Sequence, residues 1–155
     1  MTQANERWGI DLRLLRNLEH QNDRDRANDL STTVRPQTKQ VDLEVLSEAN
    51  NLIQALLLRF LTPLGELTPL GHPDYGCRLF ELIGELNNET NRNRAKLFVL
   101  QALAAEPRVK QVLSVTVTQN KSDRSRMDIN VFLKPIDSDT PLNLVFPFFL
   151  EGGVG

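Results

Sequence analysis

The residues of this chain whose types could support acid–base or nucleophilic chemistry lie in one short segment. His72, Asp74 and Cys77 fall within six residues, and a base, an orienting carboxylate and a thiol are the parts of a cysteine nucleophile. Such triads are normally assembled from distant chain segments, and Pro73 stiffens the backbone between these groups. We therefore expect no catalysis here: His72 and Asp74 would bond backbone in a turn, and Cys77 would be a small packed residue.

Other kinds of reactive site are not indicated by the residue pattern. The only other histidine is His20, and one cysteine is too few for an internal disulfide or a multi-cysteine zinc site. Glu66, Glu81 and Glu85 could form a glycosidase-like carboxylate pair, but nothing in their pattern distinguishes them from solvated surface charges. The sequence contains no phosphate-loop or dinucleotide-binding motif. We therefore predict a protein without catalytic residues, cofactor or metal.

The composition is that of an ordinary globular domain. The chain has 155 residues, 40% of them hydrophobic, with a net charge of -2, so nothing in its charge calls for nucleic acid. Apolar runs such as residues 55–58 are far shorter than the roughly 20 residues that a membrane span requires. The first residues lack the apolar core of a signal peptide. We expect a soluble protein that is not exported by a cleaved signal and not inserted in a membrane.

The front of the chain is polar. Residues 19–40 contain only three aliphatic side chains, which cannot offset the entropy lost on ordering such a stretch. We interpret residues 1–40 as a polar N-terminal extension, either a long loop or a segment that orders only against a partner. Residues 41–155 form the predicted domain. The short apolar patch at residues 8–15 is compatible with a strand or with an anchor.

Two amphipathic helices are predicted in the first part of the domain. One follows an alternating, strand-like segment at residues 41–45, begins after the favourable N-cap Ser47 and ends before Pro63. The other begins near residues 88–90 and stops before Pro107. Their apolar stripes have helical spacing and consist of Leu52, Ile53, Leu56, Leu57 and Phe60 in the first helix and Ala95, Phe98, Val99, Ala102 and Leu103 in the second.

Three strands are predicted in the last third of the chain. Polar turns at residues 120–123 and 137–141 separate them, and Pro147 predicts that the last strand lies at an edge, because proline cannot donate to a ladder. A meander with two helices on one face is an α+β layer. We thus predict two helices packed on a small antiparallel sheet of three to four strands. The predicted inward residues are Leu113, Val115 and Val117; Met127, Ile129, Val131 and Leu133; and Leu142, Leu144, Phe146, Phe148 and Leu150.

The segment after the first predicted helix repeats itself. Residues 61–65 and 67–71 both read Leu-Thr-Pro-Leu-Gly, a period too short for a stacking repeat. Three prolines and three glycines between residues 63 and 76 indicate turns with little freedom left to lose on ordering. We predict a stiff connector between the two helices that contributes shape rather than reactive groups.

Several motifs occur in a characteristic order. LIQALLLR at residues 52–59 is followed by Gly-Glu-Leu at 65–67, GHPDYG at 71–76 and Glu-Pro-Arg at 106–108. In this order they resemble the baseplate wedge family of contractile phage tails, which includes sheath initiators of tail-like injection machines and a type VI secretion relative. The ending DTPLNLVFPF resembles the subgroup from extracellular or cell-bound injection particles. Residues 1–40 are longer and more polar than this family pattern.

The resemblance implies a structural protein. Six copies would sit in the baseplate around the inner tube, contacting other wedge proteins, tube or hub proteins and the first ring of sheath subunits. Each copy would assemble in the bacterial cytoplasm and offer a sheet edge to which sheath strands add. Some relatives carry an old lysozyme label, so the alternative is an enzyme that cleaves peptidoglycan. A soluble regulatory adaptor is a third possibility, since fold does not fix function.

Five residues are predicted to meet partners. Glu106, Pro107 and Arg108 form a rigid turn that could present a carboxylate and a guanidinium to a neighbouring subunit. The same triplet could instead end the second helix, with Pro107 stopping it and Arg108 bonding the last backbone carbonyls of that helix. Phe146 and Phe148 lie in the apolar last strand, which is the predicted platform for the sheath.

Overall fold

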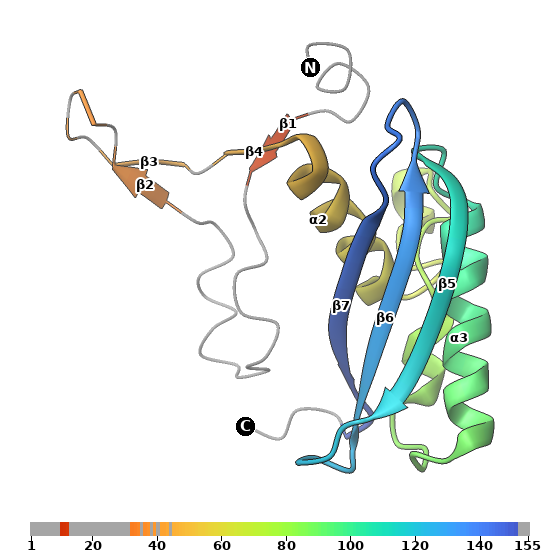
Figure 1. Ribbon diagram of the computed structural model, residues 1–155. Coiled ribbons are helices and arrows are strands. Elements are labelled where there is room, and N and C mark those ends of the chain that lie inside the picture. The colour runs from red at the N-terminus through yellow and green to blue at the C-terminus, as the bar shows by residue number, and fades with distance from the viewer. Residues whose placement is uncertain are drawn as a thin grey trace.

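The computed structural model describes residues 10–12, 32–34, 36–37, 39, 41–43 and 45–151. Its central element is an antiparallel sheet of three strands in the order β5-β6-β7 (Figure 1). The strands are β5 (Val109–Gln119), β6 (Arg126–Pro135) and β7 (Leu142–Phe149). Strand β7, which contains Pro147, lies at one edge of this sheet, as predicted.

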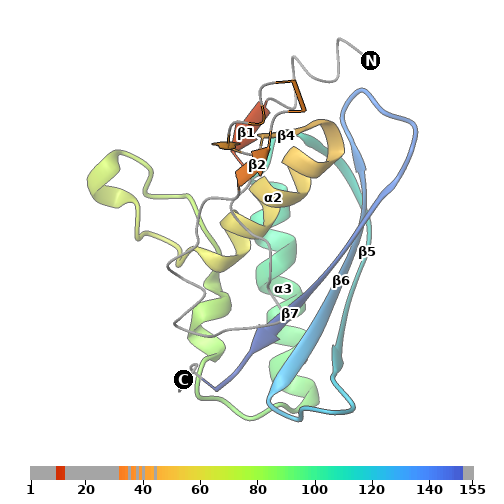
Figure 2. The same cartoon turned by 90° about the vertical axis from the view of Figure 1, so that its left-hand side faces the viewer.

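Two α-helices cover one face of the sheet (Figure 2). Helix α2 (Glu48–Leu61) ends before Pro63, and α3 (Glu89–Ala104) ends before Pro107. Asn88 is the N-cap of α3, where its side chain accepts a hydrogen bond from the Asn91 amide at 2.8 Å. None of the helices in the described part of the chain is long and apolar enough to cross a membrane. The predicted α+β fold is confirmed.

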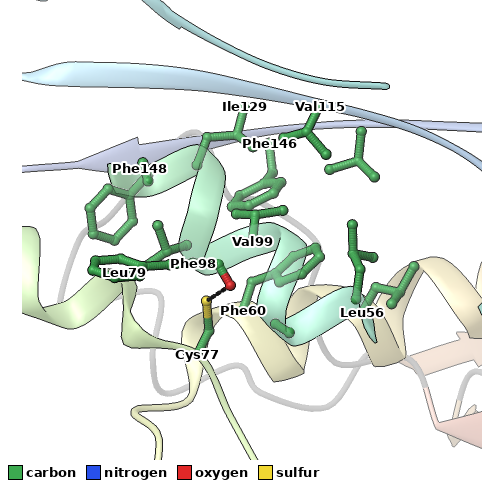
Figure 3. Packing of buried hydrophobic residues seen from close by; sticks show 14 of the residues in the cluster. Leu56, Phe60, Cys77, Leu79, Phe98, Val99, Val115, Ile129, Phe146 and Phe148 are labelled. Carbon is green, nitrogen blue, oxygen red and sulfur yellow. Dashed lines mark hydrogen bonds between the residues drawn. The ribbon is translucent and has the colours of Figure 1, made fainter. Parts of the chain in front are cut away.

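The apolar stripes meet in one core between the helices and the sheet (Figure 3). The rings of Phe60 from α2 and Phe146 from β7 stack with centroids 5.1 Å apart and planes 9° from parallel. Phe98 and Val99 from α3 and the inward residues of β6 complete the packing. Both predicted helical stripes are therefore confirmed, although Ile53 is only partly buried.

A short 3-10 helix that the sequence patterns do not predict adds to the core. This helix, η3 (Arg78–Leu82), buries Leu79 and Leu82. It lies between the proline-rich segment and α3, so that segment leads from α2 into η3 and does not join the two α-helices directly. The predicted connector lies where it was expected, but it joins α2 to η3 and not to α3.

One predicted inward residue is on the wrong face. Leu113 is 42% exposed, and Val112 packs against the core in its place. The pairing of β5 with β6 shifts register between Val112 and Ser114. Such a bulge inserts an extra residue and reverses the alternation beyond it, which explains why strict period-two counting fails at this point.

Short strands precede α2. β1 (Ile10–Leu12) pairs with β4 (Val45–Ser47), and β2 (Thr32–Val34) pairs with β3 (Val41–Leu43). The segment predicted as one strand is therefore divided between β3 and β4. Ser47 stands directly before α2, at the predicted N-cap position, but its side chain lies outside what the structure describes. Residues 1–9, 13–31, 35, 38 and 40 of the predicted N-terminal extension also lie outside the described residues.

Candidate functional site

The Glu-Pro-Arg triplet forms the corner between α3 and β5. Glu106 is 4% exposed, and its two carboxylate oxygens accept hydrogen bonds from two arginines. Oε1 accepts from the Nε and the backbone amide of Arg108 at 2.7 and 3.2 Å. Oε2 accepts from Nη2 of Arg108 at 3.2 Å and from Nη2 of Arg59 at 3.3 Å. A buried carboxylate is thus held between two cations.

These neighbours control the ionisation of Glu106. Burial alone would raise the pKa of the carboxyl, but the hydrogen bonds and charge of Arg108, with the charge of Arg59, outweigh it and lower the pKa. The Arg59 guanidinium also lies 4.6 Å from the centroid of the Tyr75 ring. Burial is the main reason that the pKa of Tyr75 is raised. The corner therefore ties α2, the segment before η3 and the start of β5 together.

The triplet presents its three residues differently. Glu106 points inward, Pro107 is exposed and the Arg108 side chain is 25% exposed. Helix α3 ends before Pro107, as predicted. Sequence reasoning missed the internal ion pairs, because Arg59 and Tyr75 are far away in the chain and no spacing rule links them to Glu106. Contact with a neighbouring subunit stays a prediction.

The proline-rich segment forms an arm that projects from the body of the protein (Figure 2). Its base is closed by the Cys77 amide donating to the Thr62 carbonyl at 2.9 Å and the Leu64 amide donating to the Cys77 carbonyl at 3.1 Å. Further out, the arm is held by its own backbone, as where the Gly71 amide donates to the Thr68 carbonyl at 3.0 Å. These bonds account for the stiffness that the sequence predicts.

The two copies of the repeated pentapeptide have different places in the arm. The first copy lies at the base of the arm, where Pro63 and Cys77 form an isolated backbone β-bridge. The second contains the 3-10 helix η2 (Thr68–Leu70) and lies at the tip, where Leu70 is 73% exposed. The repeat therefore builds two different structures and does not form a symmetric pair.

Gly76 locks the base of the arm, and its replacement tests this. Its φ is +116°, and an added Cβ would lie 2.6 Å from the Thr62 carbonyl oxygen and 2.8 Å from that of Pro63. Backbone strain and overpacking together should lower the free energy of unfolding of the Gly76→Ala variant by about 2–4 kcal/mol. Urea denaturation followed by circular dichroism measures this change.

Gly71→Ala is the matched control for Gly76→Ala. Gly71 also has a positive φ of +86°, but nothing lies within 4 Å of its added Cβ. Only the strain of the left-handed conformation remains, about 1 kcal/mol. Equal losses in the two variants would show that close backbone contact at the base of the arm does not matter.

The structure does not assemble His72, Asp74 and Cys77 into a triad. His72 and Asp74 are exposed on the arm, whereas the Cys77 thiol lies in the core and donates to the Phe98 carbonyl at 3.4 Å (Figure 3). Burial raises the pKa of this thiol and so disfavours the nucleophilic thiolate. Among the candidate carboxylates, Glu66 and Glu85 are exposed, and Glu81 pairs with Arg78. Within the described ranges, no group of three or more His, Cys, Asp or Glu residues could hold a metal ion.

The predicted partner residues of the last strand are core residues. Phe146 and Phe148 are 1% and 6% exposed, so their rings cannot reach a partner in this structure. Their inward direction follows from strand alternation, which places Asn143 and Val145 on the outer face. Any contact made by β7 must use its main chain or these outer side chains.

The chain is similar to a solved structure from Geobacter sulfurreducens that is provisionally described as a tail lysozyme. The two share 29% sequence identity with a TM-score of 0.59, over 70% of this chain and 97% of the other. No family model matches the chain, and a search of curated proteins gave no match. The likeness associates the fold with a phage tail-related family and with a phage tail-associated function.

Proposed function

We propose that this protein is a structural component of the baseplate of a phage-tail-like contractile injection particle, where it nucleates assembly of the sheath. Six copies would surround the inner tube and contact tube or hub proteins and the other wedge proteins. Each would offer an edge of its sheet to a strand of the first sheath ring. The carrying observation is the three-stranded sheet, whose outer strands β5 and β7 each have a neighbour on one side only within the described chain.

Strand addition suits a junction that repeats around a ring. An open edge supplies backbone donors and acceptors with little demand on sequence. Each hydrogen bond is worth only about 1 kcal/mol net, so one strand of about five residues binds weakly. Sixfold repetition makes the attachment multivalent and raises its effective affinity by orders of magnitude.

The corner at Glu106 is the proposed contact with a neighbouring wedge subunit. Pro107 and the outer part of Arg108 are accessible there, while the ion pair with Glu106 fixes the direction of the Arg108 guanidinium. A guanidinium oriented in advance loses less freedom when it grips a carboxylate or carbonyl of a partner.

Arg108→Ala measures how the two roles of Arg108 combine. Because the hydrogen bonds from Arg108 to a buried carboxylate are lost, we expect the free energy of unfolding of the isolated variant to fall by about 1.5–3 kcal/mol. If Arg108 also contacts a subunit, particle assembly should fail even at temperatures where the variant is folded. A folded variant that assembles normally would remove the interface role, and an unchanged melting temperature would remove the structural one.

Cells that lack this protein test the main proposal. We expect electron microscopy to show inner tubes and baseplate fragments without attached sheath. Normal contractile particles in such cells would overturn it. An adaptor, by contrast, should co-purify with a regulator in cells that have no sheath or tube proteins.

Peptidoglycan cleavage is the second candidate, favoured by the description of the Geobacter sulfurreducens protein. Purified protein should leave the turbidity of a cell-wall suspension unchanged if the structural proposal is correct. Robust clearing would favour the enzyme, and Glu66→Gln, Glu81→Gln and Glu85→Gln variants would then show which carboxylate carries it.

A further inference from the structure

We infer that the sheath strand pairs with β5, along Ser114–Gln119, and not with β7. This inference rests on the proposed function and names the edge that would perform it. It moves the contact away from the strand that contains Phe146 and Phe148, to the opposite margin of the sheet.

The hydrogen bonds at the hairpin ends show which backbone groups face outward. The Asn120 amide donates to the Arg126 carbonyl at 2.9 Å, and the Leu150 amide donates to the Ser125 carbonyl at 2.9 Å. Hydrogen-bonded and non-hydrogen-bonded pairs alternate along antiparallel strands. Combined with the register of the strands, this alternation directs the backbone nitrogens and carbonyls of alternate residues away from β6. These residues are Val115, Val117 and Gln119 on β5, and Asn143, Val145, Pro147 and Phe149 on β7.

Pro147 interrupts the outward series on β7. Its nitrogen carries no hydrogen, so a strand placed there would lose one donor between those of Val145 and Phe149. Proline at such a position is a common protection of an edge against pairing. Residues 114–119 of β5 pair in regular register with β6 and contain neither proline nor charge. The register shifts before Ser114, together with Lys110, set the beginning of this free stretch.

The core is also less complete beside β5. On β5, Val112 and Val117 point inward but are only partly buried, and Val115 between them is buried. On β7, Leu142 is partly buried, whereas Leu144, Phe146 and Phe148 are buried. Helix α3 packs against β5 and runs along that side of the sheet (Figure 1). A strand added there can place its inward side chains next to Val112 and Val117 and remove more apolar surface from water.

These features define the segment that fits. Its inward positions are apolar, to meet the two partly buried valines. Its outward positions are small or polar, to lie beside Ser114, Thr116 and Thr118, all exposed on the outer face. β-Branched and hydroxyl side chains form favourable cross-strand pairs on such a surface.

Hydrogen exchange locates the pairing without altering the protein. Intact particles and the free protein are exposed to deuterated buffer, quenched and digested, and peptides that cover residues 111–120 and 142–150 are compared by mass spectrometry. We expect the amides of Val115, Val117 and Gln119 to exchange at least about tenfold more slowly in the particle. The β7 peptide should change less.

Two proline variants provide a matched test, because each removes one outward amide and no bond to β6. Val117→Pro should abolish sheath attachment, and Val145→Pro should preserve it. Circular dichroism identifies a variant that fails to fold, and the exchange experiment then decides by itself.

The outcomes separate this inference from the proposed function. Sheath attachment with new protection only in the β7 peptide overturns the edge assignment and leaves sheath nucleation standing. Attachment with protection at neither edge overturns strand addition. Protection of β5 in a sheath-free dimer, detected by analytical ultracentrifugation, makes a second copy of this chain the occupant. If the unaltered protein does not bind sheath at all, the proposed function itself is wrong.

Discussion

Replacing Glu106 with glutamine is expected to lower the free energy of unfolding by about 3–5 kcal/mol, which is the cost of removing one partner from a buried ion pair. The substitution leaves the side chain similar in size but removes the charge between Arg108 and Arg59. Arg59 is poorly placed to compensate, since its Nε is buried without a hydrogen-bond partner in the described structure. Urea denaturation at neutral pH measures the loss.

Glu81→Gln is the control for this variant. It removes a carboxylate that also pairs with an arginine, but the Arg78–Glu81 pair lies at the surface, where water screens the interaction. Its unfolding curve should overlay that of the unaltered protein. If both variants lose the same stability, burial of the charge at the corner is not what makes Glu106 important.

The same corner predicts how stability depends on pH. The pKa of Glu106 is lower in the folded protein than its ordinary value, so the unfolded chain takes up the proton first as the pH falls. Its contribution is complete above the ordinary carboxyl pKa of about 4.3. It is lost as the pH falls through the lowered folded value. The difference in stability between the unaltered protein and Glu106→Gln should narrow over that range, and an undiminished difference would contradict the assignment.

Phe146→Ala should be the most damaging change in the sheet. The ring is 1% exposed and stacks on Phe60, so its removal leaves a cavity that costs about 3–5 kcal/mol. Thermal melting of the isolated protein measures this loss without any partner present. Loss of sheath attachment in this variant would therefore report damage to the core and not a contact by the ring.

The Val145→Ala variant tests the outer face of β7 and is the control for the core substitution Phe146→Ala. Val145 is the next residue in the strand and is 58% exposed, so its truncation should change stability by less than about 0.5 kcal/mol. If Val145→Ala destabilises the protein as much as Phe146→Ala, the assignment of the two faces is incorrect.

The features that sequence could predict are those set by local repetition. The stripes of α2 and α3 have a spacing of three and four residues, and Asn88, Pro63 and Pro107 stand where helix ends require them. The inward residues of β6 alternate with more exposed ones along the whole strand, and those of β7 do so up to Phe146, after which Pro147 is buried as well. In these elements the local preference and the tertiary structure agree, so periodicity was sufficient.

The features that sequence missed depend on contacts between distant residues. The bulge that exposes Leu113 leaves no trace in a sequence pattern that continues to alternate. Glu106 looks like an ordinary surface charge until Arg59 and Tyr75 are placed beside it. Phe146 and Phe148 were predicted both to point inward and to meet a partner, because an apolar edge strand suggests a partner surface. Their burial in the core supports only the inward direction.

The burial of Cys77 has a practical consequence for studying assembly. It is the only cysteine in the chain, and its thiol is shielded in the core with a raised pKa, so it reacts slowly with maleimides. A fluorophore or spin label can therefore be directed to one introduced cysteine, for example Leu70→Cys at the tip of the arm, without first removing the native thiol. Distances between labelled copies would then report the geometry of the arms in an assembled ring.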